Sequence, residues 1–177
     1  MVLVHGTGGV ALFAMQIAHA RGARVIITSS DETKLERARA LGTWATINYK
    51  AHDVSDAVHD LTYGCGADVV VETVGGQNLN VSLAASALGA RIAQVGLIGG
   101  QSAPVDTYRF VQRHVTVHGI DTGSREMLEQ LVAFTESAPV RPVLDATFPV
   151  GAAPDALTRL EGCGFFGKVT LDATGGW

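Results

Sequence analysis

Short runs of β-branched residues alternate along the chain with longer segments in which apolar residues recur every three or four positions. This alternation predicts strands joined by crossover helices, the arrangement of a parallel sheet with helices on both faces. Residues 2–4 predict the first strand, and residues 10–21 predict the helix that follows it. The predicted apolar face of that helix consists of Val10, Phe13, Ala14, Ile17 and Ala18.

The same patterns predict five more strands and four more helices. The strands are expected at residues 24–28, 46–48, 68–72, 91–95 and 115–119. The helices are expected at residues 29–42, 54–61, 79–88 and 125–134, the first of them beginning with a Ser29-x-x-Glu32 capping box. Residues 68–72 show no polar alternation, which predicts a central strand. Six strands in two halves predict an α/β fold, a doubly wound Rossmann sheet spanning residues 1–140.

The last part of the chain, residues 141–177, follows a different pattern. Pro139 and Pro142 interrupt the chain at the start of this part. A strand is then predicted at residues 143–144, a helix at 154–160 and a last strand at 168–171. We expect this strand–helix–strand tail to lie outside the six-stranded sheet.

A glycine-rich turn joins the first predicted strand to the first helix. Gly6-x-Gly8-x-x-Ala11 matches the dinucleotide-binding fingerprint, with a small residue at its third position. Gly6 would form the tight turn, Gly8 would let a pyrophosphate approach the backbone, and Ala11 would let the helix pack closely on the sheet. The N–H groups at the start of the helix attract an anion. The flanking strand and helix favour a nucleotide site over an incidental glycine-rich turn.

The end of the second predicted strand distinguishes NADP from NAD. NAD sites commonly carry an acidic residue there, which binds the ribose 2′-hydroxyl and would repel a 2′-phosphate. This chain has Ser29 and Ser30, whose hydroxyls could donate to a phosphate, and Lys34 could add a cation. Alternatively, a serine is only a helix cap and Lys34 a solvated charge, while Asp31 or Glu32 could reach the ribose. We expect NADP, with NAD as the alternative.

Composition excludes several other classes of function. The 13 Lys+Arg against 17 Asp+Glu give a net charge of -4 without a basic run, so we expect no nucleic-acid partner. No segment has the pattern of a membrane span or a signal peptide, which predicts a cytoplasmic protein that does not bind membranes. Cys65 and Cys163 lie far apart, so neither a disulfide framework nor a zinc site is predicted in this chain.

Seven longer motifs are distributed over nearly the whole chain. They are Val-His-Gly-Thr-Gly-Gly-Val at 4–10, Thr-Ser-Ser-Asp-Glu-Thr-Lys-Leu-Glu-Arg-Ala-Arg-Ala-Leu-Gly at 28–42, Ile-Asn-Tyr at 47–49, Val-Val-Val-Glu-Thr-Val-Gly-Gly at 69–76, Gln-Val-Gly-Leu-Ile-Gly at 94–99, Gly-Ile-Asp-Thr-Gly-Ser-Arg-Glu at 119–126 and Phe-Gly-Lys-Val at 166–169. As a set they resemble the medium-chain dehydrogenases/reductases, specifically the zinc-type alcohol dehydrogenase and quinone oxidoreductase branches.

The resemblance implies a cofactor site distributed over several loops. The residues implied to meet the pyrophosphate are Gly6, Thr7, Gly8, Gly9 and Val10. Those implied for the adenosine and its phosphate are Ser30, Lys34, Tyr49 and Val74, and those for the nicotinamide are Gly96, Leu97, Ile98, Ile120, Asp121 and Thr122. Alternatively, Tyr49 is an edge-strand aromatic residue, and Leu97, Ile98 and Ile120 are core residues. The histidines at 5, 52, 59, 114 and 118 show no base-and-nucleophile spacing, and we expect structural or solvated roles for them.

In this family a separate catalytic domain normally precedes the strand that opens this chain. The resemblance therefore implies that the substrate pocket and any zinc ligands lie in that missing domain, and no catalytic residue is assigned here. The family's tail normally joins that domain, which would leave the strands at 143–144 and 168–171 without their usual neighbours. Because exposed strand edges tend to find partners, we expect the tail to be displaced, self-paired or engaged in a homodimer. A tail packed as in a complete enzyme, without a second chain, would contradict this expectation.

The leading hypothesis is an NADP-dependent oxidoreductase module that orients the nicotinamide for hydride transfer to or from a carbonyl, alcohol or activated alkene. A small-molecule substrate would be bound largely by the catalytic domain, without which we expect the isolated chain to be inactive. The alternative is a non-catalytic nucleotide-binding module or redox sensor. An S-adenosylmethionine site is disfavoured because Ser29 stands where such sites usually carry an acidic residue.

Overall fold

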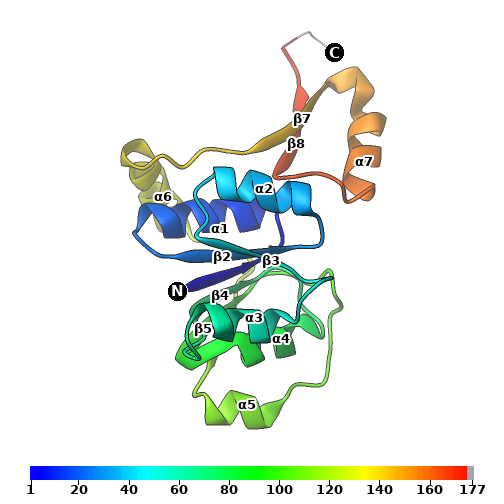
Figure 1. The fold of residues 1–177 in the computed structure, drawn as a ribbon. Coiled ribbons are helices and arrows are strands. Elements are labelled where there is room, and N and C mark those ends of the chain that lie inside the picture. Colours follow the sequence, from blue (N-terminus) through cyan, green and yellow to red (C-terminus); the bar gives the residue numbers. More distant parts are fainter. Residues whose placement is uncertain (175–177) are drawn as a thin grey trace.

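The computed structural model describes residues 1–174, and residues 175–177 of the predicted tail lie outside the described residues (Figure 1). The strands of its main sheet are β1 (Val2–His5), β2 (Val25–Ser29), β3 (Ala45–Asn48), β4 (Ala67–Glu72), β5 (Ser86–Gln94) and β6 (Thr116–Gly119). They lie in the order β3-β2-β1-β4-β5-β6, and every neighbouring pair is parallel. The predicted doubly wound sheet of six parallel strands is confirmed.

Helices cover both faces of this sheet (Figure 1). The helices on one face are α1 (Gly9–Ala20) and α2 (Glu32–Ala40), with α6 (Arg125–Ser137) beside α1. Those on the other face are α3 (Val54–Leu61), α4 (Asn78–Ala85) and α5 (Thr107–Gln112). Successive strand residues point to opposite faces, so Leu3 joins the core beneath α3 and α4, and Val4 joins the core beneath α1 and α2.

Several local details differ from the prediction. Ser29 does not cap α2 but stays in β2, and Asp31 caps the helix by accepting hydrogen bonds from the backbone N–H groups of Thr33 and Lys34. The helix expected at 79–88 ends earlier because β5 already begins at Ser86. Helix α5 was not predicted, since it is six residues long and buries none of them fully.

The tail folds into a small unit of its own. It comprises β7 (Leu144–Pro149), a 3-10 turn (Val150–Ala152), α7 (Ala153–Glu161) and β8 (Lys168–Asp172). Strands β7 and β8 pair with each other in parallel, separately from the six-stranded sheet. Phe166 anchors this unit because it is fully buried in the core of α1 and α2, and the N–H of Gly167 donates to the carbonyl of Thr7 at 2.9 Å.

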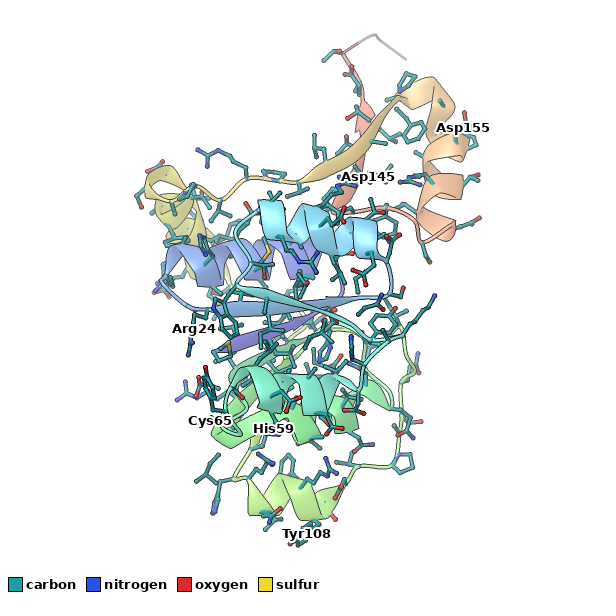
Figure 2. All side chains as sticks on the ribbon, in the orientation of Figure 1. Arg24, His59, Cys65, Tyr108, Asp145 and Asp155 are labelled. Atoms are coloured by element: carbon teal, nitrogen blue, oxygen red, sulfur yellow. The ribbon has the colours of Figure 1, made fainter. Side chains whose placement is uncertain are left out.

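Asp145 lies where β7 passes above α2 (Figure 2). Its side chain connects the tail to that helix. Its carboxylate accepts from the N–H of Phe166 at 3.0 Å, from Arg37 at 3.3 Å and from Arg159 at 2.7 Å. Its side chain is only 3% exposed. Burial acts to raise the pKa of Asp145, but these hydrogen bonds outweigh it and hold the pKa below its ordinary value. The loop before β8 is therefore held in a fixed position against the main sheet.

Candidate dinucleotide-binding site

The turn between β1 and α1 leaves the start of the helix open. Gly6 has a φ of +78°, the left-handed conformation that a tight strand-to-helix turn requires and that favours glycine. Gly8 is the N-cap of α1, and no side chain among residues 1–174 caps this helix. A Cβ added at Gly8 would meet no atom within 4 Å. The start of α1 thus has open space beside Gly8, at the carboxyl ends of the strands, where the strand order reverses between β1 and β4.

Lys168 supplies a cation at this helix terminus, a role that was not predicted from the sequence. Its side chain lies directly over Gly9, where a Cβ would collide with the lysine methylenes and with Nζ. The backbone of β8 is held there because Gly167 pairs with Gly8. A lysine beside the positive end of the α1 dipole makes this place attractive to an anion. The Phe-Gly-Lys-Val motif was the only signal for it in the sequence.

The residues after β2 are engaged in hydrogen bonds within the chain. Ser29 is buried, and its hydroxyl accepts from the N–H of Asp31 at 3.2 Å. The Asp31 carboxylate is used in capping α2, and that of Glu32 accepts from Asn48 at 2.6 Å. Ser30 is half-buried beside them. Both acidic side chains named as possible ribose ligands therefore have partners in this structure.

Lys34 is half-buried and has a defined partner. Its Nζ donates to the carbonyl oxygen of Cys163 at 2.7 Å and lies 6.0 Å from the centre of the Phe165 ring. Lys34 therefore has a hydrogen-bond partner within the chain, at the exposed surface. The ammonium group is held between α2 and the loop that precedes β8.

A cavity of about 430 Å³ opens between the ends of β1 and β2 and the helices α3 and α4. Its lining includes Gly6, Thr28, Tyr49, His52, Val74 and Asn78. This volume is within the usual range for small-ligand sites. Tyr49 is 52% exposed and directly follows β3, which is an edge strand, so it is both an edge residue and a wall of the cavity. The structure thus brings Gly6, Tyr49 and Val74 together, as the resemblance implies.

A buried hydrogen-bond network lies beneath the cavity and was not predicted. His5 Nε2 lies 3.0 Å from the Ser82 hydroxyl, which donates to Glu72 at 2.5 Å. The other carboxylate oxygen of Glu72 accepts from the N–H groups of Val74 and Gly75 at 2.8 and 3.0 Å. Glu72 is fully buried. Its carboxylate therefore shapes the turn that follows β4.

Protonation of this network follows from burial and hydrogen bonding. Burial lowers the pKa of His5 by more than the nearby Glu72 charge raises it, so the imidazole is neutral at neutral pH. Burial acts to raise the pKa of Glu72, but the hydrogen bonds that the carboxylate accepts from Ser82, Gly75 and Val74 hold that pKa below its ordinary value. A neutral His5 donates from Nε2 to Ser82, and its Nδ1 accepts from Thr28 at 3.5 Å. Because the Thr28 hydroxyl also accepts from the N–H of Gly6 at 3.2 Å, a continuous chain of hydrogen bonds joins the glycine turn to Glu72.

The residues that follow β5 and β6 are exposed at the carboxyl ends of the strands. Leu97 is 61% exposed, Ile98 93% and Ile120 41%, so the alternative that they are core residues is wrong. Asp121 and Thr122 follow Ile120 and are also exposed. A Cβ at Gly96 would collide with the Thr73 carbonyl, which shows that the turns after β4 and β5 are in backbone contact. The ends of β5 and β6 therefore expose large apolar side chains.

Within residues 1–174 no three His, Cys, Asp or Glu side chains gather closely enough to hold a metal ion. In the same range no helix has the length and apolar character needed to cross a membrane.

Comparison with known proteins identifies the family. The model of the zinc-binding dehydrogenases matches residues 9–137. A zinc-type alcohol dehydrogenase-like protein of Schizosaccharomyces pombe is 35% identical over 175 residues, which cover 96% of this chain and 51% of that protein. The chain spans about half the length of the curated relatives it matches.

Solved structures agree with this assignment. A protein of Sinorhizobium meliloti described as an alcohol dehydrogenase is 41% identical, with a TM-score of 0.92 over 97% of this chain and 50% of that one. An NAD-dependent alcohol dehydrogenase is 36% identical, with a TM-score of 0.85 over 97% of this chain and 50% of its own. A mycobacterial protein complexed with NADPH is 28% identical, with a TM-score of 0.81 over 96% of this chain and 56% of its own.

The shared region includes nearly all of the tail, since 97% of the chain superposes on a longer enzyme. Of the outcomes expected for the tail, the structure shows self-pairing, because its two strands pair with each other. The predicted resemblance to alcohol dehydrogenases and quinone oxidoreductases is confirmed by the matched model and by these relatives. The chain belongs to the zinc-binding dehydrogenase family of medium-chain dehydrogenases/reductases.

Proposed function

We propose that this chain is the dinucleotide-binding half of an NADP-dependent oxidoreductase, acting on a carbonyl, alcohol or activated alkene. The observation that carries the proposal is the open N-terminus of α1, where Gly8 faces free space and Lys168 adds a cation. The residues present fit a dinucleotide because a side chain at position 8 would occupy the space a pyrophosphate needs. The nicotinamide supplies the hydride chemistry when bound.

The preference for NADP rests on the end of β2. Ser30 and Lys34 offer a hydroxyl and a cation, while the carboxylates of Asp31 and Glu32 bind amide groups of the chain itself. A buried Ser29 in place of an acidic residue leaves no carboxylate in β2 to repel a 2′-phosphate. NAD is the alternative cofactor, and one solved relative is described as NAD-dependent.

The apolar surface at the ends of β5 and β6 suits the nicotinamide. Leu97, Ile98 and Ile120 would pack against the ring and exclude water from it. The small-molecule substrate would then be bound largely by the other half of the enzyme. We also retain the expectation of a cytoplasmic homodimer as part of the proposal.

Titration of the chain with NADPH and NADH by calorimetry tests the proposal. We expect NADPH to bind more tightly than NADH. Gly8→Ala should abolish binding of both, whereas Gly151→Ala, where a Cβ also meets open space, should leave both unchanged. Tighter NADH binding would overturn the NADP assignment, and no binding of either nucleotide would overturn the cofactor site. Oxidation of NADPH with quinones or aldehydes by the chain joined to its catalytic half would show an enzyme, and NADPH binding without such turnover would favour a non-catalytic module.

A further inference from the structure

We propose that the loop of residues 162–165 is a positioning element that holds the Lys34 ammonium ready for the 2′-phosphate of NADPH. The inference rests on the proposed function. It assigns to Phe165, a residue far from the glycine turn in sequence, an effect on the choice between NADPH and NADH.

Two contacts from the loop fix the position of Lys34. The Cys163 carbonyl accepts a hydrogen bond from Nζ at 2.7 Å, and the Phe165 ring lies 6.0 Å away, within the range of a cation–π contact. A lysine ammonium carries three N–H donors. The carbonyl takes one of them, so two remain for the oxygens of a phosphate.

The loop is itself held from several sides. Cys163 has a φ of 52°, a left-handed conformation that non-glycine residues adopt only when their surroundings enforce it. Its N–H donates to the Leu160 carbonyl at 3.1 Å, and Arg159 donates to the Gly164 carbonyl at 3.2 Å. Asp145 fixes the end of the loop through the N–H of Phe166. The carbonyl that holds Lys34 therefore does not depend on a ligand for its position.

Holding a long side chain before binding changes affinity in a selective way. A free lysine loses rotamer freedom when it binds a phosphate, and a lysine that is already held loses less. The benefit applies only to a ligand that contacts Lys34. NADH lacks the 2′-phosphate, so the loop should influence NADPH binding and leave NADH binding unchanged.

Phe165→Ala tests this in the full chain, with NADPH and NADH titrated separately. We expect the Kd for NADPH to rise about two- to twelve-fold, the range for immobilising one such side chain, and the Kd for NADH to stay the same. Phe148→Ala, at another half-buried phenylalanine of the tail, is the matched control and should change neither. Phe165→Leu keeps an apolar side chain without the aromatic face and serves as the test if the alanine variant folds poorly. It should also raise the Kd for NADPH.

Lys34→Gln completes the test. It should weaken NADPH binding more than Phe165→Ala, and the double variant should be no weaker than Lys34→Gln alone because Phe165 acts through Lys34. If Lys34→Gln weakens NADPH binding but both Phe165 variants leave it unchanged, the inference fails and the proposed function stands. The same holds if Phe165→Ala weakens NADPH and NADH equally. If Lys34→Gln has no effect on NADPH, or if neither nucleotide binds, the NADP assignment fails together with the inference.

Discussion

Replacement of Glu72 by glutamine tests the buried network beneath the cofactor turns. One carboxylate oxygen of this fully buried residue accepts from the N–H groups of Val74 and Gly75. The other accepts from Asn78 at 2.7 Å and from Ser82 at 2.5 Å. Glutamine has nearly the same shape as glutamate. If its amide oxygen keeps the bonds from the N–H groups of Val74 and Gly75, its amide nitrogen, itself a donor, faces the donors of Asn78 and Ser82. Glu72→Gln therefore breaks the network without creating a cavity.

The expected loss can be worked out from these contacts. A hydrogen bond to a charged group contributes about 1.5–3 kcal/mol, and a buried polar group left unpaired costs about 1–3 kcal/mol. Two side-chain bonds are lost, and the two backbone bonds persist in weaker form. We expect Glu72→Gln to lower the free energy of unfolding at neutral pH by about 3–5 kcal/mol in urea titrations. Glu36→Gln, on an exposed position of α2, is the control and should stay within about 0.5 kcal/mol.

The pH dependence adds a second requirement. The pKa of Glu72 is held below its ordinary value of 4.5, so its stabilisation is present above that pH and is lost as the pH falls below it. The pKa of His5 is held below its ordinary value of 6.5, so stability also declines as the pH falls below 6.5, where the unfolded chain takes up the proton. The difference between wild type and Glu72→Gln should therefore narrow below pH 4.5. Equal urea midpoints at neutral pH, or a difference that stays constant down to acid pH, would refute this account of Glu72.

Three further predictions concern the cofactor turn and the tail. Gly8→Ala should melt within a few degrees of wild type, because its Cβ meets open space, yet lose nucleotide binding; a large drop in Tm would show that the glycine is structural. Lys168→Ala should weaken the binding of NADPH and of NADH alike, by about 10- to 150-fold if one charge-assisted bond to the pyrophosphate is lost. An effect on NADPH alone would show that Lys168 does not contact the pyrophosphate. Asp145→Asn should lower stability by about 1–3 kcal/mol, since Arg37 and Arg159 lose a shared partner, measured by urea unfolding; unchanged stability would contradict its role in fixing the tail.

Most of the fold could be predicted because its signals are local. Each strand and most helices carry their own β-branched run or apolar period, and right-handed crossovers restrict how parallel strands are ordered. The prediction was wrong where burial outweighs local preference. Residues 86–90 include two alanines and a glycine, poor strand formers, yet they belong to β5. Asp31 replaced Ser29 as the cap because Ser29 pairs with Asn48 in the sheet.

The site was predictable only where one segment carries its chemistry. The glycine turn is such a segment, since strand, glycines and helix follow one another. The network of His5, Ser82 and Glu72 is not, because folding joins residues that are up to 77 positions apart. No spacing rule connects them. The apolar residues Leu97 and Ile98 were ambiguous for a related reason, since the sequence cannot show that their side chains are exposed.

The tail contributes to the proposed cofactor site by positioning two lysines. It places Lys168 over the start of α1 and, through the Cys163 carbonyl, holds Lys34 after β2, so both proposed phosphate cations depend on it. Its attachment is not separable from the fold, because Phe166 fills the core of α1 and α2 and Arg37 stacks on its ring at 4.2 Å. Burial of an aromatic side chain of this kind contributes about 3–5 kcal/mol, as large-to-small core substitutions show. The same contacts that stabilise α2 therefore set the positions of the charges around the proposed cofactor.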